Sequence, residues 1–566
     1  MKTEKMPLKT EKRTEEKVMK IQKFAALLLA ATMTVSLAAC GGNKEQGATA
    51  SYPGTRDENM VTVDLGAEPP ELNSLLTTDV ASGDILRMTM AGLTKLDEND
   101  QPQPDLAESW EISEDKTTYT LKLRQDGKWT NGEPVTANDF VYAWRLVCSQ
   151  ETASPYGFII FDNLVNGNEV FKGELPPEEL GVKALDDYTL EVRFNNPIPY
   201  ALHLFSFSTY YPVNQKAYEE IGAAAYAKDA DKIVTNGAYV IEDWLHDDHI
   251  TLAKNPEYYN ADDMAIEKVK FLMMKDTNTR MNAFKAGEVD AIDISGDQVD
   301  QLKAEGVETK AFVDNGNWFL QYNTETKGLN NAKIRRALGM AIDLNSLCEN
   351  VRRDGSVPAG GVVPTGIMGA DGQKFADARG NIIEYNVEEA KKLFEEGLSE
   401  EGLTADTLKL TLIVDDTSAA QKEAAFYQEQ WKSGLGLQVE ITPMPFKARL
   451  AAMQEGNFDI AFRGWSPDYN DAMTYLDMFA TTNGNNYGKY SSEKYDTLIA
   501  DAMNEVDPVK RQEMLVECEK ILCNEDAPIF PLYYSTKPYV LSSKLQGATR
   551  TGFQEWDFQD GATIAK

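Results

Sequence analysis

The sequence predicts an α/β protein with two or more domains, and three observations support this fold class. The chain has 566 residues, enough for several domains and a large core. Hydrophobic residues make up 42% and charged residues 26%, a composition typical of an ordinary folded protein. Segments with strand periodicity alternate with segments of helical periodicity as far as Pro528, without an internal repeat of short period.

The charge balance excludes two classes of partner. The chain carries 90 Asp and Glu against 56 Lys and Arg, which gives a formal net charge of −34 at pH 7. Nucleic acids and anionic membrane surfaces would be repelled by such a surface, because both select clustered basic residues. The charge favours cationic ligands, although a generally acidic protein surface explains the bulk value equally well.

The first 39 residues are predicted to be an export signal. Lys20 and Lys23 precede an apolar run, Phe24–Ala39, that is too short and too weakly apolar for a permanent membrane span. The run leads into Leu-Ala-Ala-Cys-Gly, which resembles the lipobox of bacterial lipoproteins. The resemblance implies that Cys40 becomes the lipidated first residue of the mature chain. The alternative is an ordinary secretory signal followed by an incidental cysteine.

A polar stretch from Asn43 to Asn59 follows this signal. Its Gly, Ser, Thr and charged residues bury too little apolar area to fold, so we expect a flexible tether over residues 40–56. Met19 is an alternative start to Met1, since the residues between them add only a charged prefix.

The folded part is expected to begin with a strand, a loop and a helix between residues 61 and 96, the helix ending near Gly92. Thr118–Leu123 alternates as a strand. Thr136 and Asp139 have the spacing of a capping box, which predicts a helix start. This helix presents a core-facing stripe of Phe140, Val141, Trp144 and Val147.

Two histidines, His246 and His249, flank a pair of aspartates and so raise the question of a metal site. The flanking residues read as a hairpin, with strands around Tyr239–Trp244 and Ile250–Leu252. The histidines therefore fall in a turn with no third ligand nearby. We expect no metal and no other cofactor.

The remaining cysteines, Cys148, Cys348, Cys518 and Cys523, lack metal-binding spacing. Cys518 falls on an apolar helical stripe, which favours a buried thiol, while a disulfide stays open in an exported chain. Ile334, Leu338, Ala341 and Ile342 form the stripe of another helix, predicted to pack on a sheet.

The segment Phe458–Phe479 carries the candidate site. It begins with the alternation of a strand that has one buried face, with Phe458, Ile460 and Phe462 on that face. An acidic and aromatic loop follows, and then a helical stripe of Met473, Leu476 and Phe479. Gly464 would let a ligand backbone approach, Trp465 would supply a flat apolar wall, and Asp468 would pair with an ammonium group. The alternative is an acidic surface turn after a core strand.

The loop text GWSPDYND closely resembles the ligand-contacting segment of the oligopeptide-binding proteins, the extracytoplasmic solute receptors of peptide ABC transporters. The resemblance covers residues 57 to 566 and includes the segment from Pro104 to Val147. It implies that Asp468 pairs with the free amino terminus of a bound peptide. One departure is that Ala472 stands where a proline usually follows the second aspartate.

The resemblance also implies an architecture of two lobes joined by a hinge around a ligand cleft, a periplasmic-binding-protein-like fold with an extra domain. The implied first lobe comprises residues 57–92, 216–315 and 536–566, the extra domain residues 93–215, and the second lobe residues 316–535. The partners would be the permease and ATPase subunits of an importer, and the receptor itself would be a monomer.

Further contacts are implied residue by residue. Thr78, Asp79 and Val80 would offer backbone groups to the peptide. Tyr156, in the motif TASPY, either contacts the peptide backbone or is simply packed. Phe446 is a further candidate contact.

The loop Asn483–Tyr490 is either beside the ligand, with Asn485 or Asn486 hydrogen-bonding it, or a plain turn. Arginines that meet the peptide's carboxylate in some family members align with Phe462 and Met453. The nearest arginine, Arg463, is expected to point away from the cleft, which leaves peptide length open.

The sequence leaves two other functions to consider. An enzyme is disfavoured, because GWSPD lacks the second glycine of a nucleophile elbow and the chain has no HExxH, Walker or dinucleotide motif. The same fold with another cargo, such as nickel, an oligosaccharide or a signalling peptide, stays open, because one fold hosts many ligands.

Overall fold

The computed structural model describes residues 51–77, 79–553 and 556–565, without the side chains of Ser418, Phe446 and Lys447. Residues 51–566 form one compact unit. The predicted signal and Cys40 lie outside the described residues. No helix in the described ranges has the length and apolar character to cross a membrane.

One mixed sheet organises this unit. Within the described residues it has eleven strands in the order β15-β14-β16-β12-β17-β11-β1-β10-β9-β8, with β13 paired to β17. Its strands are β1 (Met60–Asp64), β8 (Tyr239–Leu245), β9 (His249–Lys254), β10 (Lys268–Leu272), β11 (Ala291–Asp293), β12 (Lys310–Tyr322), β13 (Val357–Pro358), β14 (Leu410–Asp415), β15 (Val439–Met444), β16 (Ile460–Trp465) and β17 (Ile529–Leu541). β1 runs parallel to β10 and β11, and β14 runs parallel to β15 and β16, so the sheet has a parallel portion in each half.

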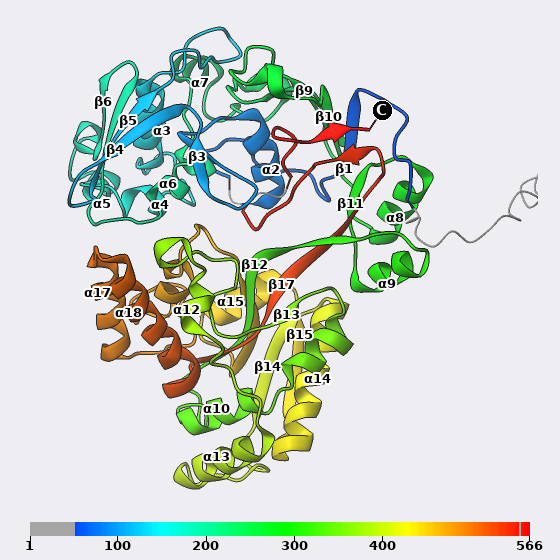
Figure 1. Ribbon diagram of the computed structural model, residues 1–566. Coiled ribbons are helices and arrows are strands. Elements are labelled where there is room, and N and C mark those ends of the chain that lie inside the picture. The colour runs from blue at the N-terminus through cyan, green and yellow to red at the C-terminus, as the bar shows by residue number, and fades with distance from the viewer. Residues whose placement is uncertain (1–50, 78, 554–555, 566) are drawn as a thin grey trace, which may run out of the picture. The chain divides into compact units, whose positions relative to one another are not determined.

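A separate antiparallel sheet, β4-β5-β7-β6, forms the part of the chain expected to be the extra domain (Figure 1). The smaller strands are β2 (Thr94–Leu96), β3 (Pro102–Pro104), β4 (Ala107–Ile112), β5 (Thr118–Leu123), β6 (Val182–Asp186), β7 (Thr189–Arg193), β18 (Leu545–Gln546) and β19 (Thr563–Ile564). The capping box is confirmed, with the Thr136 backbone N–H donating to Asp139 Oδ2 at 2.7 Å.

The elements form two groups. One is built on the β1 half of the large sheet and the antiparallel sheet, and the other is built on the β14 half of the large sheet (Figure 1). Helices flank the sheets in both groups. Their bounds are α2 (Val80–Thr89), α3 (Ala137–Val147), α4 (Phe158–Phe161), α5 (Gly167–Phe171), α6 (Ala201–Leu204), α7 (Gln215–Ile221), α8 (Thr277–Ala286), α9 (Gly296–Ala304), α10 (Ala332–Met340), α11 (Leu344–Ser346), α12 (Phe375–Arg379), α13 (Val387–Glu400), α14 (Ser418–Leu435), α15 (Phe446–Gln454), α16 (Met473–Leu476), α17 (Glu493–Asn504) and α18 (Pro508–Lys520). The stripes predicted on α3 and α10 are buried, because they face the cores of their own groups.

The two halves of the large sheet are joined by β12 and β17, which run side by side between the two groups of elements (Figure 1). Their antiparallel register shifts between Val313 and Asn317. At this bulge Ser535 Oγ donates to Asp314 Oδ1 at 2.5 Å, and the Gly316 N–H donates to the same oxygen at 2.9 Å. The bulge thus places a side-chain hydrogen bond where a ladder bond is missing.

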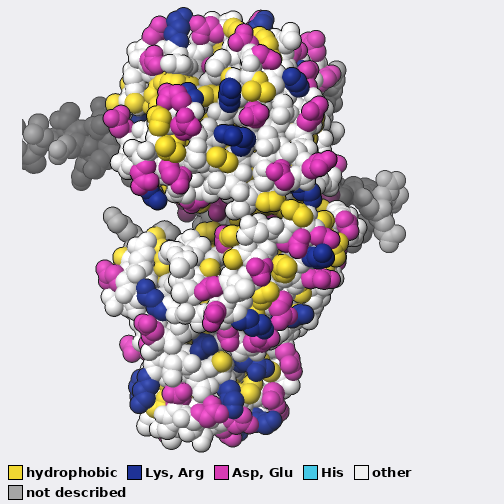
Figure 2. Space-filling view, turned by 90° about the vertical axis from the view of Figure 1, so that its left-hand side faces the viewer, with side chains coloured by type: hydrophobic (Ala, Val, Ile, Leu, Met, Phe, Trp, Pro, Cys, Tyr) yellow, Lys and Arg dark blue, Asp and Glu magenta, His cyan; other side chains and the backbone are white. Residues whose placement is uncertain are grey.

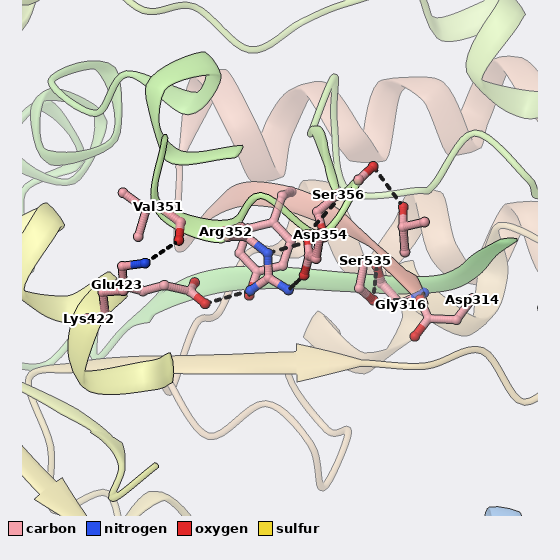
Figure 3. A network of polar contacts seen from close by, with 12 residues as sticks. Asp314, Gly316, Val351, Arg352, Asp354, Ser356, Lys422, Glu423 and Ser535 are labelled. Atoms are coloured by element: carbon pink, nitrogen blue, oxygen red, sulfur yellow. Dashed lines mark hydrogen bonds and ion pairs between the residues drawn. The ribbon is translucent and has the colours of Figure 1, made fainter. Parts of the chain in front are cut away.

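Beside the bulge, a buried charge network fastens β17 to its neighbours (Figure 3). Arg352 bonds to Glu423 Oε1 at 2.5 Å and to Asp354 Oδ2 at 2.6 Å. It also donates to the Tyr533 hydroxyl at 2.5 Å and lies over the Tyr533 ring. Because Glu423 belongs to α14, the network ties that helix to the joining strand.

Three expectations on local structure need correction. The tether does not extend to residue 56, because Tyr52 packs on Phe284 and Thr55 hydrogen-bonds Asp290. The first helix ends at Thr89 and not near Gly92. β16 is buried on both faces, since Ile460 and Phe462 pack into one hydrophobic cluster and Ala461 packs into another.

Other expectations on local structure are confirmed. β8 and β9 form the predicted hairpin, with both histidines beside its turn. His246 contacts Glu68 and Asp229, while His249 contacts Asp243 and Asp248. All four cysteines of the described part are buried free thiols.

We expect the substitution Gly316→Ala to weaken the joint between β12 and β17. A Cβ at this position would lie 2.4 Å from Ser535 Oγ and 3.0 Å from Asp314 Oδ1. Overpacking of this kind costs about 1–3 kcal/mol, measurable by urea denaturation. In the Ser535→Ala background the loss should be smaller, and equal losses in both backgrounds would contradict the proposed contact.

Candidate functional site

The candidate site is the loop between β16 and α16, and a buried ion pair holds it in place. Asp471 accepts bonds from both terminal nitrogens of Arg511 at 2.8 Å, and its Oδ1 also accepts from the Met473 N–H at 2.9 Å. Arg511 lies on α18, so the loop is fastened to a helix distant in sequence. The predicted stripe Met473, Leu476 and Phe479 is buried beneath it.

Asp468 lies three residues earlier on the same loop, and its contacts are hydrogen bonds and not an ion pair. Its backbone N–H donates to Thr474 Oγ1 at 3.3 Å, and the Tyr156 hydroxyl lies 3.5 Å from its Oδ1. No lysine or arginine of the described part forms an ion pair with it. Burial raises the pKa of Asp468 to about 6, against a small opposing effect of the Tyr156 hydroxyl. The carboxylate is therefore half-buried and lacks a cation.

Two cavities meet at Asp468. The first, of about 360 Å³, is lined by the start of α2, by residues 466–468 and by C-terminal residues within 552–553 and 556–560. The second, of about 530 Å³, is lined by residues near α4 and α6 and by the segment from Trp465 to Asn485. Figure 2 shows the surface hollowed between the two groups of elements. Cavities of this size accommodate ligand side chains together with part of a ligand backbone.

Most of the predicted contacts surround these cavities. Asp79, Val80, Tyr156 and Asp468 line the first, and Trp465, Asn485 and Asp468 line the second. Thr78 and the Phe446 side chain lie outside the described part.

The start of α2 faces the first cavity. Asp79 is the N-cap and accepts from the Ser82 N–H at 2.9 Å, while its other oxygen, Oδ2, is buried without a hydrogen-bond partner among the described residues. Val80 follows with 57% of its surface exposed. A helix start with an unsatisfied carboxylate oxygen can accept a hydrogen bond from a ligand amide.

The structure gives a different reason for a glycine at position 464 from the expected approach of a ligand backbone. Gly464 lies opposite Trp318 in the β12–β16 pair, and a Cβ there would lie 2.8 Å from the Trp318 ring. Gly464 does not line either cavity. Its lack of a side chain therefore makes room for an internal indole.

The structure separates the two candidate asparagines. Asn485 lines the second cavity, whereas Asn486 is buried and bonds to the Tyr490 backbone through both its oxygen and its nitrogen. Arg463 is buried beside Asn485, donating to Gln321 Oε1 at 3.0 Å and to the Asn485 carbonyl at 3.3 Å. It lines neither cavity, as expected for a side chain pointing away.

Sequence reasoning missed Asp477 and His203. Asp477 lines the second cavity, and burial together with repulsion from Asp468 and Asp471 raises its pKa to about 7. Its position directly after the Leu476 of the apolar stripe was the available signal. His203 lines the first cavity, and no sequence pattern pointed to it.

The large sheet has two halves joined by two strands, and two cavities of ligand size lie beside the candidate loop. This arrangement is typical of a solute receptor, and the described residues contain no recognisable catalytic group. The chain belongs to the family described as bacterial extracellular solute-binding proteins, family 5 Middle, which matches residues 101–487. Members of this family bind solutes without converting them, so the chain is not an enzyme.

Similar proteins support the assignment over nearly the full length. The chain is 32% identical to the oligopeptide-binding protein OppA of Bacillus subtilis over 550 residues, 95% of this chain and 98% of the relative. It is 31% identical over 535 residues to the dipeptide-binding protein DppE of the same organism, 94% of this chain and 97% of the relative. The chain is thus similar to peptide-binding receptors of two kinds.

Solved structures agree. The substrate-binding domain of an oligopeptide ABC transporter from Bacillus anthracis has a TM-score of 0.76 and 34% identity, covering 91% of this chain and 100% of that one. OppA of Listeria monocytogenes, solved with a bound peptide, has a TM-score of 0.74 and 33% identity over 90% of this chain and 99% of that one. The fold is therefore the predicted two-lobed one with an extra domain.

We expect opposite effects on stability from neutralising the two neighbouring aspartates. The pKa of Asp468 in the ligand-free protein lies above its usual value of about 3.9, so ionisation opposes folding as pH rises through about 6. Asp468→Asn should raise the melting temperature at pH 7.5 and lose this advantage at pH 4.

The matched control is Asp471→Asn, which leaves the buried Arg511 without its counter-charge and should lower stability by about 3–5 kcal/mol. Calorimetry of ligand-stripped samples at both pH values measures both effects. A lower melting temperature for Asp468→Asn at pH 7.5 would show that Asp468 has a cationic partner after all.

Proposed function

We propose that this chain binds peptides through their free amino terminus at Asp468 and delivers them to an ABC-type importer. One observation carries the proposal: a half-buried carboxylate without a cationic partner in the described part lies where two ligand-sized cavities meet. Burial makes an ionised carboxylate unfavourable when it has no counter-charge. A carboxylate of this kind therefore binds a cation strongly, because the ammonium group supplies the missing positive charge.

The remaining contacts suit a ligand recognised by its backbone. Peptides of different sequence share their amides, so a broad receptor must bind those groups. Trp465 Nε1 is buried without a hydrogen-bond partner among the described residues and can donate to a peptide carbonyl. Asp79 Oδ2 can accept from a peptide N–H on the other side of Asp468. The two groups would hold an extended chain between them.

The proposed lobes are those expected from the sequence: residues 57–92, 216–315 and 536–566 for the first, and 316–535 for the second, with residues 93–215 as the extra domain. Both proposed boundaries between lobes fall at the bulge where Gly316 and Ser535 face each other, which supports a hinge at that place. Closure about it would enclose the ligand, as in hinged receptors of this class.

The family is described as extracellular. Within that setting we propose that Cys40 carries a lipid that anchors the receptor to the cell membrane, with a short tether ending before Tyr52. Support comes from the lipobox-like motif, because a lipid attached to its cysteine adds buried acyl chain that binds the membrane.

We expect Asp468→Ala to weaken binding of a free penta-alanine peptide by at least about 10- to 100-fold, the value of one charge-assisted hydrogen bond. Wild-type protein should bind the N-acetylated peptide as weakly as the variant binds the free one. Isothermal titration calorimetry measures both. Equal affinities of wild type for free and acetylated peptides would refute recognition of the amino terminus.

The same interaction predicts the pH dependence of binding. Protonation of Asp468 below about pH 6 removes the anion, and deprotonation of the peptide amine above about pH 8 removes the cation, so affinity should peak between them. Asp477 titrates in the same range, so the profile is repeated in Asp477→Asn to isolate Asp468. A profile that stays flat down to pH 4.5 would contradict the assignment.

The anchor has its own test. Expressed in a bacterium with a lipoprotein-processing system, wild-type protein should appear in the membrane fraction with incorporated labelled palmitate. Cys40→Ala should abolish the label and shift the protein to a soluble or secreted fraction. Labelling that persists in the variant would exclude Cys40 as the modified residue.

A further inference from the structure

His203 is a buried side chain whose polar atoms the fold itself does not use. It lies on α6, is 5% exposed and lines the first cavity. Neither Nδ1 nor Nε2 has a hydrogen-bond partner within the described residues. A buried polar atom left unsatisfied is unfavourable by about 1–3 kcal/mol, so two of them in one ring call for a functional explanation.

The ring is nevertheless held in one position. It packs edge-on against Phe553, with ring centroids 4.5 Å apart and planes at 72°. The backbone is fixed on both sides, because Ser206 Oγ donates to the His203 carbonyl at 2.7 Å and Thr94 Oγ1 donates to the Leu202 carbonyl at 2.6 Å. The ring is therefore positioned by apolar packing and backbone bonds, and its nitrogens are not used to hold it.

The charge state of the ring restricts the chemistry of that ligand. Burial lowers the pKa of His203 to about 3, so the imidazole is neutral in any ordinary medium. A neutral imidazole has one N–H donor and one acceptor. A carboxylate would require protonation of the ring, and an ammonium would use the acceptor alone.

The rest of the cavity wall does not change this preference. Three basic groups line the cavity: Lys95 and Arg87 form ion pairs with Asp560 and Asp84, and Lys537 lies over the Phe312 ring. Phe207 and Phe553 contribute apolar surface beside the ring. An uncharged polar group on a ligand would thus find an imidazole as its partner and apolar walls around it.

We propose that His203 is a specificity residue of the first cavity, which receives an uncharged hydrogen-bonding side chain of the bound peptide, such as the carboxamide of Asn or Gln. A carboxamide carries both a donor and an acceptor, so it can bond to either the N–H or the unprotonated nitrogen of the neutral ring. The proposal rests on the proposed function, since it names the side chain that accompanies an amino terminus held at Asp468.

The test is a scan of penta-alanine in which Gln, or Met of similar size, replaces each position after the first in turn. Calorimetry on wild type should show one position where Gln binds about fivefold or more tighter than Met. His203→Leu should abolish that difference and leave the affinity for penta-alanine unchanged within twofold. His203→Asn, which keeps a donor and an acceptor, should retain part of it.

Stability separates this role from a structural one. Because His203→Leu removes two unsatisfied polar atoms, ligand-free protein should keep or raise its melting temperature. A clear decrease would overturn the proposal by showing that the ring nitrogens stabilise the fold.

Two binding outcomes would also overturn it: a preference for Gln that survives in His203→Leu, or the absence of any position preferring Gln. Tighter binding of Glu than Gln, with proton uptake seen by titration in two buffers, would assign a carboxylate to the cavity in its place. If wild type failed to bind penta-alanine at all, the proposed function would fail with it, whereas binding without preference would refute the role of His203 alone.

Discussion

The pairing of β12 with β17 is the interaction on which the rest of the structure depends. Each strand has thirteen residues, and their register runs from Lys310 opposite Tyr539 to Gln321 opposite Ile529. β11 attaches to one end of β17 and β16 to the other end of β12, so both halves of the sheet are built on this pair. Its partners are more than two hundred residues apart in sequence, which makes the sheet a product of long-range contacts.

That constraint explains why polar groups gather at the joint. A bulge interrupts the ladder at Gly316, and Asp314 and Ser535 supply the hydrogen bonds that the backbone cannot make there. The Arg352 network then fixes β17 to α14 on one side of the bulge only (Figure 3). The ladder has register shifts at this bulge and again between Trp318 and Phe319, and the Arg352 network bonds to Tyr533, which is paired with Trp318.

Neighbouring carboxylates in the candidate site differ in whether they have a cationic partner among the described residues. Asp471 has a guanidinium partner and holds the loop. Burial raises the pKa values of Asp468 and Asp477, and repulsion from Asp468 and Asp471 raises that of Asp477 further. Unfavourable ionisation in a ligand-free cavity is the expected property of a site built for a cation. His203 is a neutral counterpart of these carboxylates. Its ring packs on Phe553, but its nitrogens have no hydrogen-bond partner among the described residues.

Much of the local structure could be predicted from sequence, because it depends on neighbours in the chain. The periodicity of Thr118–Leu123, the capping box at Thr136 and the hairpin around His246 each involve residues a few positions apart. The position of Asp468 was predicted through the resemblance of its loop. The burial of both faces of β16 could not be predicted, because alternation in residues 458–463 does not reveal that distant segments pack against each face of the sheet.

By itself, the sequence determined the α/β class and the family and singled out Asp468 as the candidate site aspartate, since these are encoded in local pattern and in the GWSPDYND motif. Only the tertiary structure decided what surrounds that aspartate: that Gly464 accommodates Trp318, that Asn485 and not Asn486 lines a cavity, and that His203 lies across from the loop. The physical reason is that burial, cavity shape and the partners of a charge are properties of contacts between distant segments.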